Sequence, residues 1–146
     1  MRLTARITDG EKTLHLTFGT YAAKRFCDLM ECSADELDML TQFSGRNLHR
    51  AMVAMMQAGA EHAAMAMDSN VRLTEFEACE WIDAADKEGQ GKAIRDAFCA
   101  SILNIHPDKV DEWFAGLNDR VAEANAALEE AKKKAQDGTS PSPGES

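Results

Sequence analysis

The sequence predicts a mainly α-helical protein with a short N-terminal β-hairpin and a long C-terminal helix. Three observations predict this fold class. Apolar and polar residues alternate over residues 2–18, on either side of an Asp9-Gly10 turn. After Gly19, apolar residues recur every three or four positions, which is typical of one face of a helix. A seam with the same spacing continues over residues 117–135.

The first element expected along the chain is the hairpin. Its apolar residues alternate on both strands: Leu3, Ala5 and Ile7 on the first, and Leu14, Leu16 and Phe18 on the second. Gly10 can adopt the positive φ that a tight turn between the strands requires. Because an isolated hairpin is only marginally stable in water, we expect its apolar face to pack against helices.

The helices are expected in the following order. Residues 21–31 form the first, and Ser33 with Glu36 has the pattern of a capping box that opens a short helix ending near Leu40. A long helix follows over residues 46–67, after the Ser44-Gly45 break. These segments belong to a predicted hairpin-plus-helical domain over residues 1–104.

Two more helices complete that domain, and a third extends from it. Thr74 with Glu77 is a second capping-box pattern, for a helix ending near residue 85. The next helix begins near Lys92 and ends at His106-Pro107, where the histidine is a candidate cap. The last helix covers residues 113–135, within a predicted acidic helical extension at 105–136. Residues 137–146, rich in Pro and Ser, are expected to be a disordered tail.

Composition bounds the choice of partners. The chain has 146 residues, 45 % of them apolar, and a formal net charge of −9. Residues 1–72 hold nine acidic and eight basic residues, whereas residues 73–146 hold sixteen acidic and eight basic. The sums are −1 and −8, so the second half carries the negative charge. Because binders of nucleic acid or anionic membranes need a basic surface, we expect neither as a partner.

The cysteines and the apolar segments favour a cytoplasmic protein. The four cysteines form neither a C-x-x-C pair nor a zinc pattern, so we expect buried thiols that act as small hydrophobes: Cys27, Cys32, Cys79 and Cys99. No apolar run reaches the roughly 18 residues that span a bilayer, and residues 1–12 lack the apolar core of a signal peptide.

The helix over residues 46–67 is the most informative segment. One face collects six apolar or small residues: Leu48, Met52, Met55, Gly59, Ala63 and Ala66. The opposite face holds a narrow polar line: Arg50, Gln57, Glu61 and Asp68. Such a helix is either a central core helix or a core helix that also offers one side to a partner. Methionine suits adaptable binding surfaces, which is why the second reading stays open.

No catalytic or metal-binding pattern is recognised. His49 and His62 are thirteen residues apart on the same helix, too far to share a metal ion, and neither has a nucleophile or an orienting carboxylate at a familiar spacing. Glu77, Glu80 and Asp83 share one side of their helix, where they form a solvated face, a cation site or a docking patch for a basic partner. We therefore expect no enzyme and no cofactor.

The seam of the C-terminal helix is a candidate for self-association. Its larger apolar residues are Leu117, Val121 and Leu128, and alanines fill the other seam positions. Such a seam is too thin for a strong coiled coil, but it can pack on the domain, on a second copy or on a client. The lysines at positions 132–134 are explained by the helix dipole, which favours cations at a C-terminus.

Three segments resemble the tail assembly chaperones of long-tailed bacteriophages. They read LHLTFGTYAAKRFCDLM, NLHRAMVAMMQAGAEHAAM and TEFEACEWIDAAD, and they cover roughly residues 14–86. The resemblance implies a non-enzymatic protein that binds the long helical tape measure protein, keeps it soluble, and gives way as the tail tube protein polymerises around it. It implies residence in the host cytoplasm and absence from the mature virion.

The resemblance and the apolar helix together give a contact hypothesis. The tape measure protein is the expected partner, with the tail tube protein as a further candidate, and the residues expected to contact the client are Phe26, Met30, Met52, Met55, Met56 and Met67. Two other classes stay open. One is a small structural component of the tail, such as a completion or connector protein. The other is an acidic helical inhibitor of a host enzyme.

Overall fold

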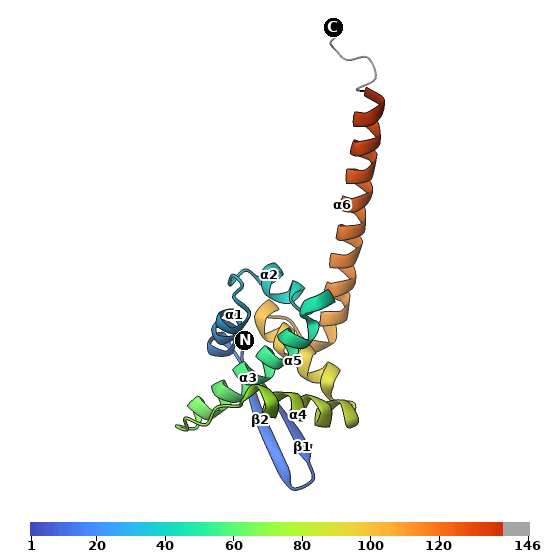
Figure 1. Ribbon diagram of the computed structural model, residues 1–146. Helices are drawn as coiled ribbons and strands as arrows, with labels where there is room; N and C mark the ends of the chain where they lie inside the picture. The colour runs from blue at the N-terminus through green and yellow to red at the C-terminus, as the bar shows by residue number, and fades with distance from the viewer. Residues whose placement is uncertain (139–146) are drawn as a thin grey trace. The chain divides into compact units, whose positions relative to one another are not determined.

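The computed structural model describes residues 1–138 and confirms the predicted fold class of a hairpin, a set of helices and a long C-terminal helix (Figure 1). The chain divides into two compact units, Met1–Val110 and the residues from Asp111 onward. The boundary lies six residues beyond the predicted one, because the fully buried Val110 belongs to the first unit. Of the predicted tail at 137–146, residues 137 and 138 are helical and the rest lie outside the described residues.

The hairpin forms over the segment predicted for it. β1 (Leu3–Asp9) pairs antiparallel with β2 (Lys12–Phe18), with Leu3 opposite Phe18. Gly10 is the first of two loop residues and has a φ of +64°, as the first central residue of a type II′ turn does. The turn is thus one residue later than the Asp9-Gly10 pair predicted, since Asp9 still belongs to β1.

Five helices and two short 3-10 turns complete the first unit. They are α1 (Thr20–Met30), α2 (Glu36–Thr41), η1 (Gly45–Asn47), α3 (Leu48–Ala66), α4 (Glu75–Lys87), α5 (Gly91–Leu103) and η2 (Pro107–Lys109). α3 is central, because it contacts β2, α1, α4 and α5. α4 crosses the hairpin and packs against β1, as does α5 (Figure 1).

A cluster of aromatic rings joins the hairpin to the helices. The Phe98 ring on α5 lies 5.3 Å from that of Phe18, 4.9 Å from that of Phe26 and 5.7 Å from that of Phe43, measured between centroids. Gly59 of α3 lets β2 approach closely, since a Cβ at this position would lie 2.5 Å from Cε1 of Phe18. These contacts place the core between the apolar face of the hairpin and α3.

Two of the predicted helix ends are correct, and one is wrong. Thr74 caps α4 as predicted: its hydroxyl accepts from the Glu77 N–H at 3.1 Å, and the Glu77 carboxylate accepts from the Thr74 N–H at 2.9 Å. His106 caps η2, with Nδ1 accepting from the backbone N–H of Asp108 at 3.2 Å.

The wrong prediction is the capping box that began with Ser33. The N-cap of α2 is Asp35, whose carboxylate accepts from the Asp38 N–H at 3.1 Å. Ser33 instead donates its N–H and its hydroxyl to the Asp38 carboxylate, both at 2.8 Å. These hydrogen bonds from Ser33 lower the pKa of Asp38. Asp35 is therefore the N-cap in place of the predicted Ser33. Both residue types suit an N-cap, and their spacing in the sequence did not show which of the two would be used.

The second unit is built on α6, which starts at Val110 in the first unit and extends to Gly138. It begins three residues earlier than predicted and ends three residues later. Trp113 and Phe114 meet edge to face with their centroids 5.2 Å apart. Every residue from 118 to 135 is exposed, which includes the seam residues Val121 and Leu128.

Candidate functional site

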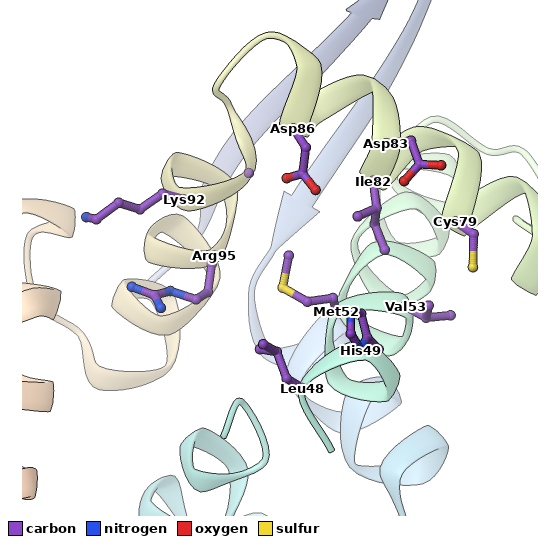
Figure 2. A pocket seen from close by; sticks show the side chains of 11 residues that line it. Leu48, His49, Met52, Val53, Cys79, Ile82, Asp83, Asp86, Lys92 and Arg95 are labelled. Carbon is purple, nitrogen blue, oxygen red and sulfur yellow. The ribbon is translucent and has the colours of Figure 1, made fainter. Parts of the chain in front are cut away.

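A groove of about 540 Å³ lies between α3, α4 and α5 (Figure 2). Its lining combines apolar, thiol and charged side chains: Leu48, His49, Met52, Val53, Cys79, Ile82, Asp83, Asp86, Gly91, Lys92 and Arg95. In Figure 2, Met52 of α3 and Ile82 of α4 face each other across the groove, and Leu48 lies below Met52. Apolar side chains therefore line the middle of the groove, and charged side chains line its α4 and α5 walls.

Helical spacing explains how each wall presents these residues. Leu48 and Met52 are four residues apart on α3, so they lie on one side of that helix. Cys79, Ile82 and Asp86 are spaced by three and four on α4 and likewise share a side. The walls converge where α5 begins, because a Cβ on Gly91 would lie 2.5 Å from Oδ1 of Asp86. A larger residue at position 91 would make the exposed Asp86 carboxylate turn aside.

The two charged walls have opposite signs. α4 contributes Asp83 and Asp86, whereas α5 contributes Lys92 and Arg95. Both basic side chains are held by the buried carboxylate of Asp96: Lys92 Nζ lies 2.7 Å and the Arg95 guanidinium 3.1 Å from its oxygens. A segment that enters the groove thus meets an apolar strip with the carboxylates of α4 on one side and, on the other, two basic side chains that are paired with Asp96.

The structure corrects most of the predicted client contacts. Phe26, Met30, Met55 and Met56 are at most 4 % exposed, so they belong to the core and form no surface. The physical reason is that β2 and three helices surround α3, so most of its wide apolar face packs inside the protein.

The other two predicted contact residues lie apart from each other. Met52 lines the groove, as described above. Met67 is exposed and lines a separate cavity, beside the hairpin. The predicted contact residues are therefore split between the core, the groove and the hairpin side. Ile82, which faces Met52, was missed, because its residue type and spacing fit an ordinary core position equally well.

The cysteine prediction holds for one thiol of four. Cys99 is buried, Cys27 and Cys32 are half-buried, and Cys79 is exposed. Burial raises the pKa of both Cys99 and Cys32 to about 12, and for Cys32 the neighbouring Cys27 adds to the effect. Burial also raises the pKa of Cys27. Cys79 is therefore the accessible thiol of the groove.

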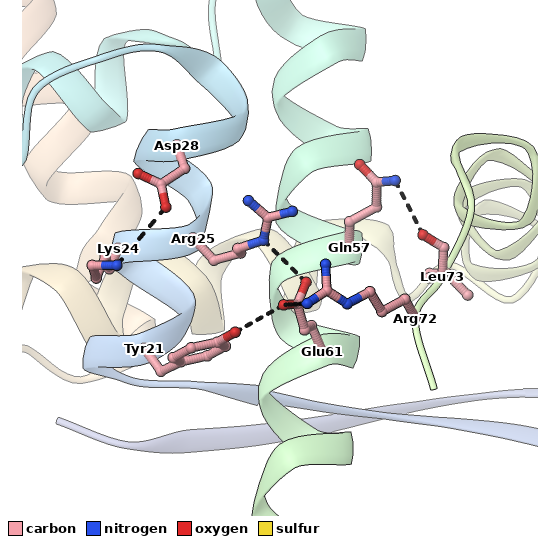
Figure 3. Close-up of polar contacts among 8 residues, drawn as sticks. All are labelled: Tyr21, Lys24, Arg25, Asp28, Gln57, Glu61, Arg72 and Leu73. Carbon is pink, nitrogen blue, oxygen red and sulfur yellow. Dashed lines mark hydrogen bonds and ion pairs between the residues drawn. The ribbon is translucent and has the colours of Figure 1, made fainter. Parts of the chain in front are cut away.

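A buried polar network was also missed (Figure 3). Glu61, expected on the solvent side of its helix, is 5 % exposed. Its carboxylate accepts from the Tyr21 hydroxyl at 2.8 Å and from Arg25 Nε at 3.1 Å, and the Arg72 guanidinium lies 3.6 Å away. Tyr21 and Arg25 are one turn apart on α1, which brings both to the same carboxylate.

This network sets the ionisation of its members. Burial alone would raise the pKa of Glu61, but the hydrogen bonds from Tyr21 and Arg25 and the charges of Arg25 and Arg72 outweigh it and lower the pKa. The hydrogen bond to Glu61 in turn raises the pKa of Tyr21. The carboxylate is thus ionised and fully partnered, an arrangement that joins α1 to α3.

Among the side chains that the structure describes, no group of three or more His, Cys, Asp or Glu is placed to hold a metal ion. Across the same part of the chain, no helix is long and apolar enough to cross a membrane. Comparisons with protein-family models, with curated proteins and with solved structures each found no match.

Proposed function

We propose that this protein is a non-enzymatic tail assembly chaperone of a long-tailed bacteriophage, which binds the tape measure protein and keeps it soluble in the host cytoplasm. The observation that supports this function best is the groove between α3, α4 and α5, with its apolar strip between an acidic and a basic wall. The groove residues of two of its three walls, α3 and α4, lie within the residues 14–86 that resemble this family.

The chemistry of the groove suits a helical client. Met52 and Ile82 offer apolar contact without a polar group that would select one side chain, and methionine adapts to partners of varied shape. An amphipathic helix binds such a groove through side chains three, four and seven residues apart. The acidic and basic walls would orient a client helix that carries charge on both of its edges.

The acidity of the second half fits the same role. Residues 73–146 carry a net charge of −8, which would keep a complex with an apolar client from aggregating through self-repulsion. On this proposal the chaperone leaves as the tail tube protein assembles, and it is absent from the mature virion.

The test is co-purification of the tape measure protein of the same phage with matched variants. Met52→Gln with Ile82→Gln replaces the facing apolar side chains of the groove, and Leu37→Gln changes an exposed leucine on α2 outside it. Since full burial of each such side chain is worth about 1.5–3 kcal/mol, we expect the double variant to recover at least about tenfold less client. The Leu37 variant should recover as much as the wild type.

Two results would contradict this assignment. One is unchanged client recovery by the double variant with its helical circular dichroism intact. The other is an equal loss in the Leu37 variant, which would show that the groove is not the site. Mass spectrometry of purified virions addresses the alternative of a structural tail component, because such a component stays in the particle and a chaperone does not.

A further inference from the structure

A second cavity, of about 520 Å³, lies at the start of α1, away from the groove. Its lining includes Arg2, Gly19, Thr20, Tyr21, Lys24 and His62. The proposed client site uses none of these residues. Two of them are basic, whereas no carboxylate lines this cavity among the residues that the structure describes.

The cavity surrounds a helix N-terminus that no side chain caps. α1 has Gly19 as its N-cap, and no side-chain hydrogen bond closes the helix there. The intrahelical bonds begin with the Ala23 N–H, which donates to the Gly19 carbonyl at 3.0 Å. The N–H groups of Thr20, Tyr21 and Ala22 precede that bond, and such groups together with the helix dipole attract anions.

A buried histidine faces the same place. His62 is 5 % exposed, and its Nδ1 is buried without a hydrogen-bond partner. A Cβ on Gly19 would lie 3.0 Å from Cε1 and 3.8 Å from Nδ1 of this ring, so the Cε1–Nδ1 edge of the imidazole lies beside the N-cap of α1. Tyr21 holds the ring edge to face at 5.7 Å between centroids. An unpartnered buried nitrogen is costly, so a ligand that pairs with it would be favoured here.

The surrounding charges favour an anion over a cation. Arg2 lies near enough to His62 to lower its pKa, in addition to the larger effect of burial. The buried carboxylate of Glu61, the residue before His62, is already bound by Tyr21 and two arginines. The Lys24 ammonium lies 4.0 Å from Asp28, an exposed pair that leaves the amine accessible. On a chain with a net charge of −9, this is a local basic site.

We infer that this cavity binds a small oxyanion, a phosphate or a carboxylate, between the N-terminus of α1, Arg2 and His62. The first-turn N–H groups donate to its oxygens, the His62 ring supplies one further N–H, and Arg2 balances the charge. The anion is either free phosphate or the carboxylate of a bound polypeptide, since both present the same oxygens.

The experiment is a titration of the ¹⁵N-labelled chain, followed by amide and imidazole resonances, with sodium phosphate in one arm and sodium acetate in the other. Sodium chloride keeps the ionic strength constant. We expect saturable shifts at Thr20, Tyr21 and His62. Saturation by phosphate alone would assign free phosphate, and saturation by acetate as well would assign a carboxylate source.

Matched variants make the result specific. Arg2→Gln should weaken binding about tenfold through the loss of one charge-assisted contact, whereas Arg6→Gln, an exposed arginine on β1 outside this cavity, should leave it unchanged. Gly19→Ala, at an extended φ of −159° that any residue adopts, should weaken binding because its Cβ displaces the His62 ring. Shifts that do not saturate, or that are equal in the two arginine variants, would overturn the inference.

Discussion

Replacement of Glu61 by alanine tests the buried network that joins α1 to α3. The Glu61 side chain is 7 % exposed, and it is paired with Arg25 at 3.1 Å and with Arg72 at 3.6 Å. It also accepts the Tyr21 hydroxyl at 2.8 Å. The variant removes the acceptor of all three groups and leaves the Arg25 guanidinium, which is 28 % exposed, without its partner.

The expected cost follows from burial. Removing one partner of a buried ion pair costs about 3–5 kcal/mol, and Arg25 can regain some water, so we expect about 3 kcal/mol of lost unfolding free energy for Glu61→Ala. Arg72 is 68 % exposed, so Arg72→Ala should cost about 0–1 kcal/mol. Glu31→Ala is the matched control, because its 3.5 Å pair with Arg50 is exposed on both sides and should also be worth about 0–1 kcal/mol.

Urea unfolding at two pH values measures the cost of Glu61→Ala and the direction in which this cost changes with pH. The folded-state pKa of Glu61 lies below its ordinary value. Its contribution is therefore complete above the ordinary carboxyl pKa and is lost as the pH falls through the lowered folded-state pKa. The difference in unfolding free energy between wild type and Glu61→Ala should thus be large at pH 7 and shrink in acid. A cost under 1 kcal/mol at pH 7, or a difference that grows in acid, would refute this reasoning.

Three further changes have expected outcomes. Gly59→Ala should cost about 1–3 kcal/mol of unfolding free energy by urea titration, because its Cβ forces the Phe18 ring to move; no loss would mean that the ring has room. Thr74→Ala should cost about 0.5–2 kcal/mol through loss of the α4 cap, and an unchanged urea midpoint would contradict this. Self-association through α6 stays a prediction. Sedimentation should show an association that salt strengthens, because the charged side chains at the positions directly beside the seam are basic in both copies: Arg120, Lys132 and Lys134. Val121→Asn with Leu128→Asn should abolish it; a dimer that persists in this variant would exclude the seam.

Local signals in the sequence predicted much of the fold. The alternation over residues 2–18 placed Ile7 and Leu16 on the buried face of the hairpin, because a side-chain period of two separates the two faces. Thr17 was predicted on the polar face but is buried. The Thr74 capping box gave the start of α4 to the residue. Both features depend on neighbours close in the chain, which a single sequence displays directly.

The candidate site was harder to predict because it depends on distant contacts. The apolar face of α3 looked the same whether β2 or a client covered it, so Met55 and Met56 were assigned to a surface although they lie in the core. Glu61 was placed in solvent because its partners, Tyr21 and Arg25, are 40 and 36 residues away. Helical periodicity gives the face of a residue, but it does not say which element covers that face.

The alkylation rate of Cys79 tests the central claim most directly. This thiol is exposed and lines the groove, whereas burial raises the pKa of Cys99 and of Cys32 to about 12 and so keeps them protonated and slow to react. Mass spectrometry after brief iodoacetamide treatment would compare the free chain with its complex with the tape measure protein. A client in the groove should slow the alkylation of Cys79 by at least about tenfold, since the thiol then loses its contact with solvent. Equal rates at Cys79 in the free chain and in the complex would contradict the groove as the client site.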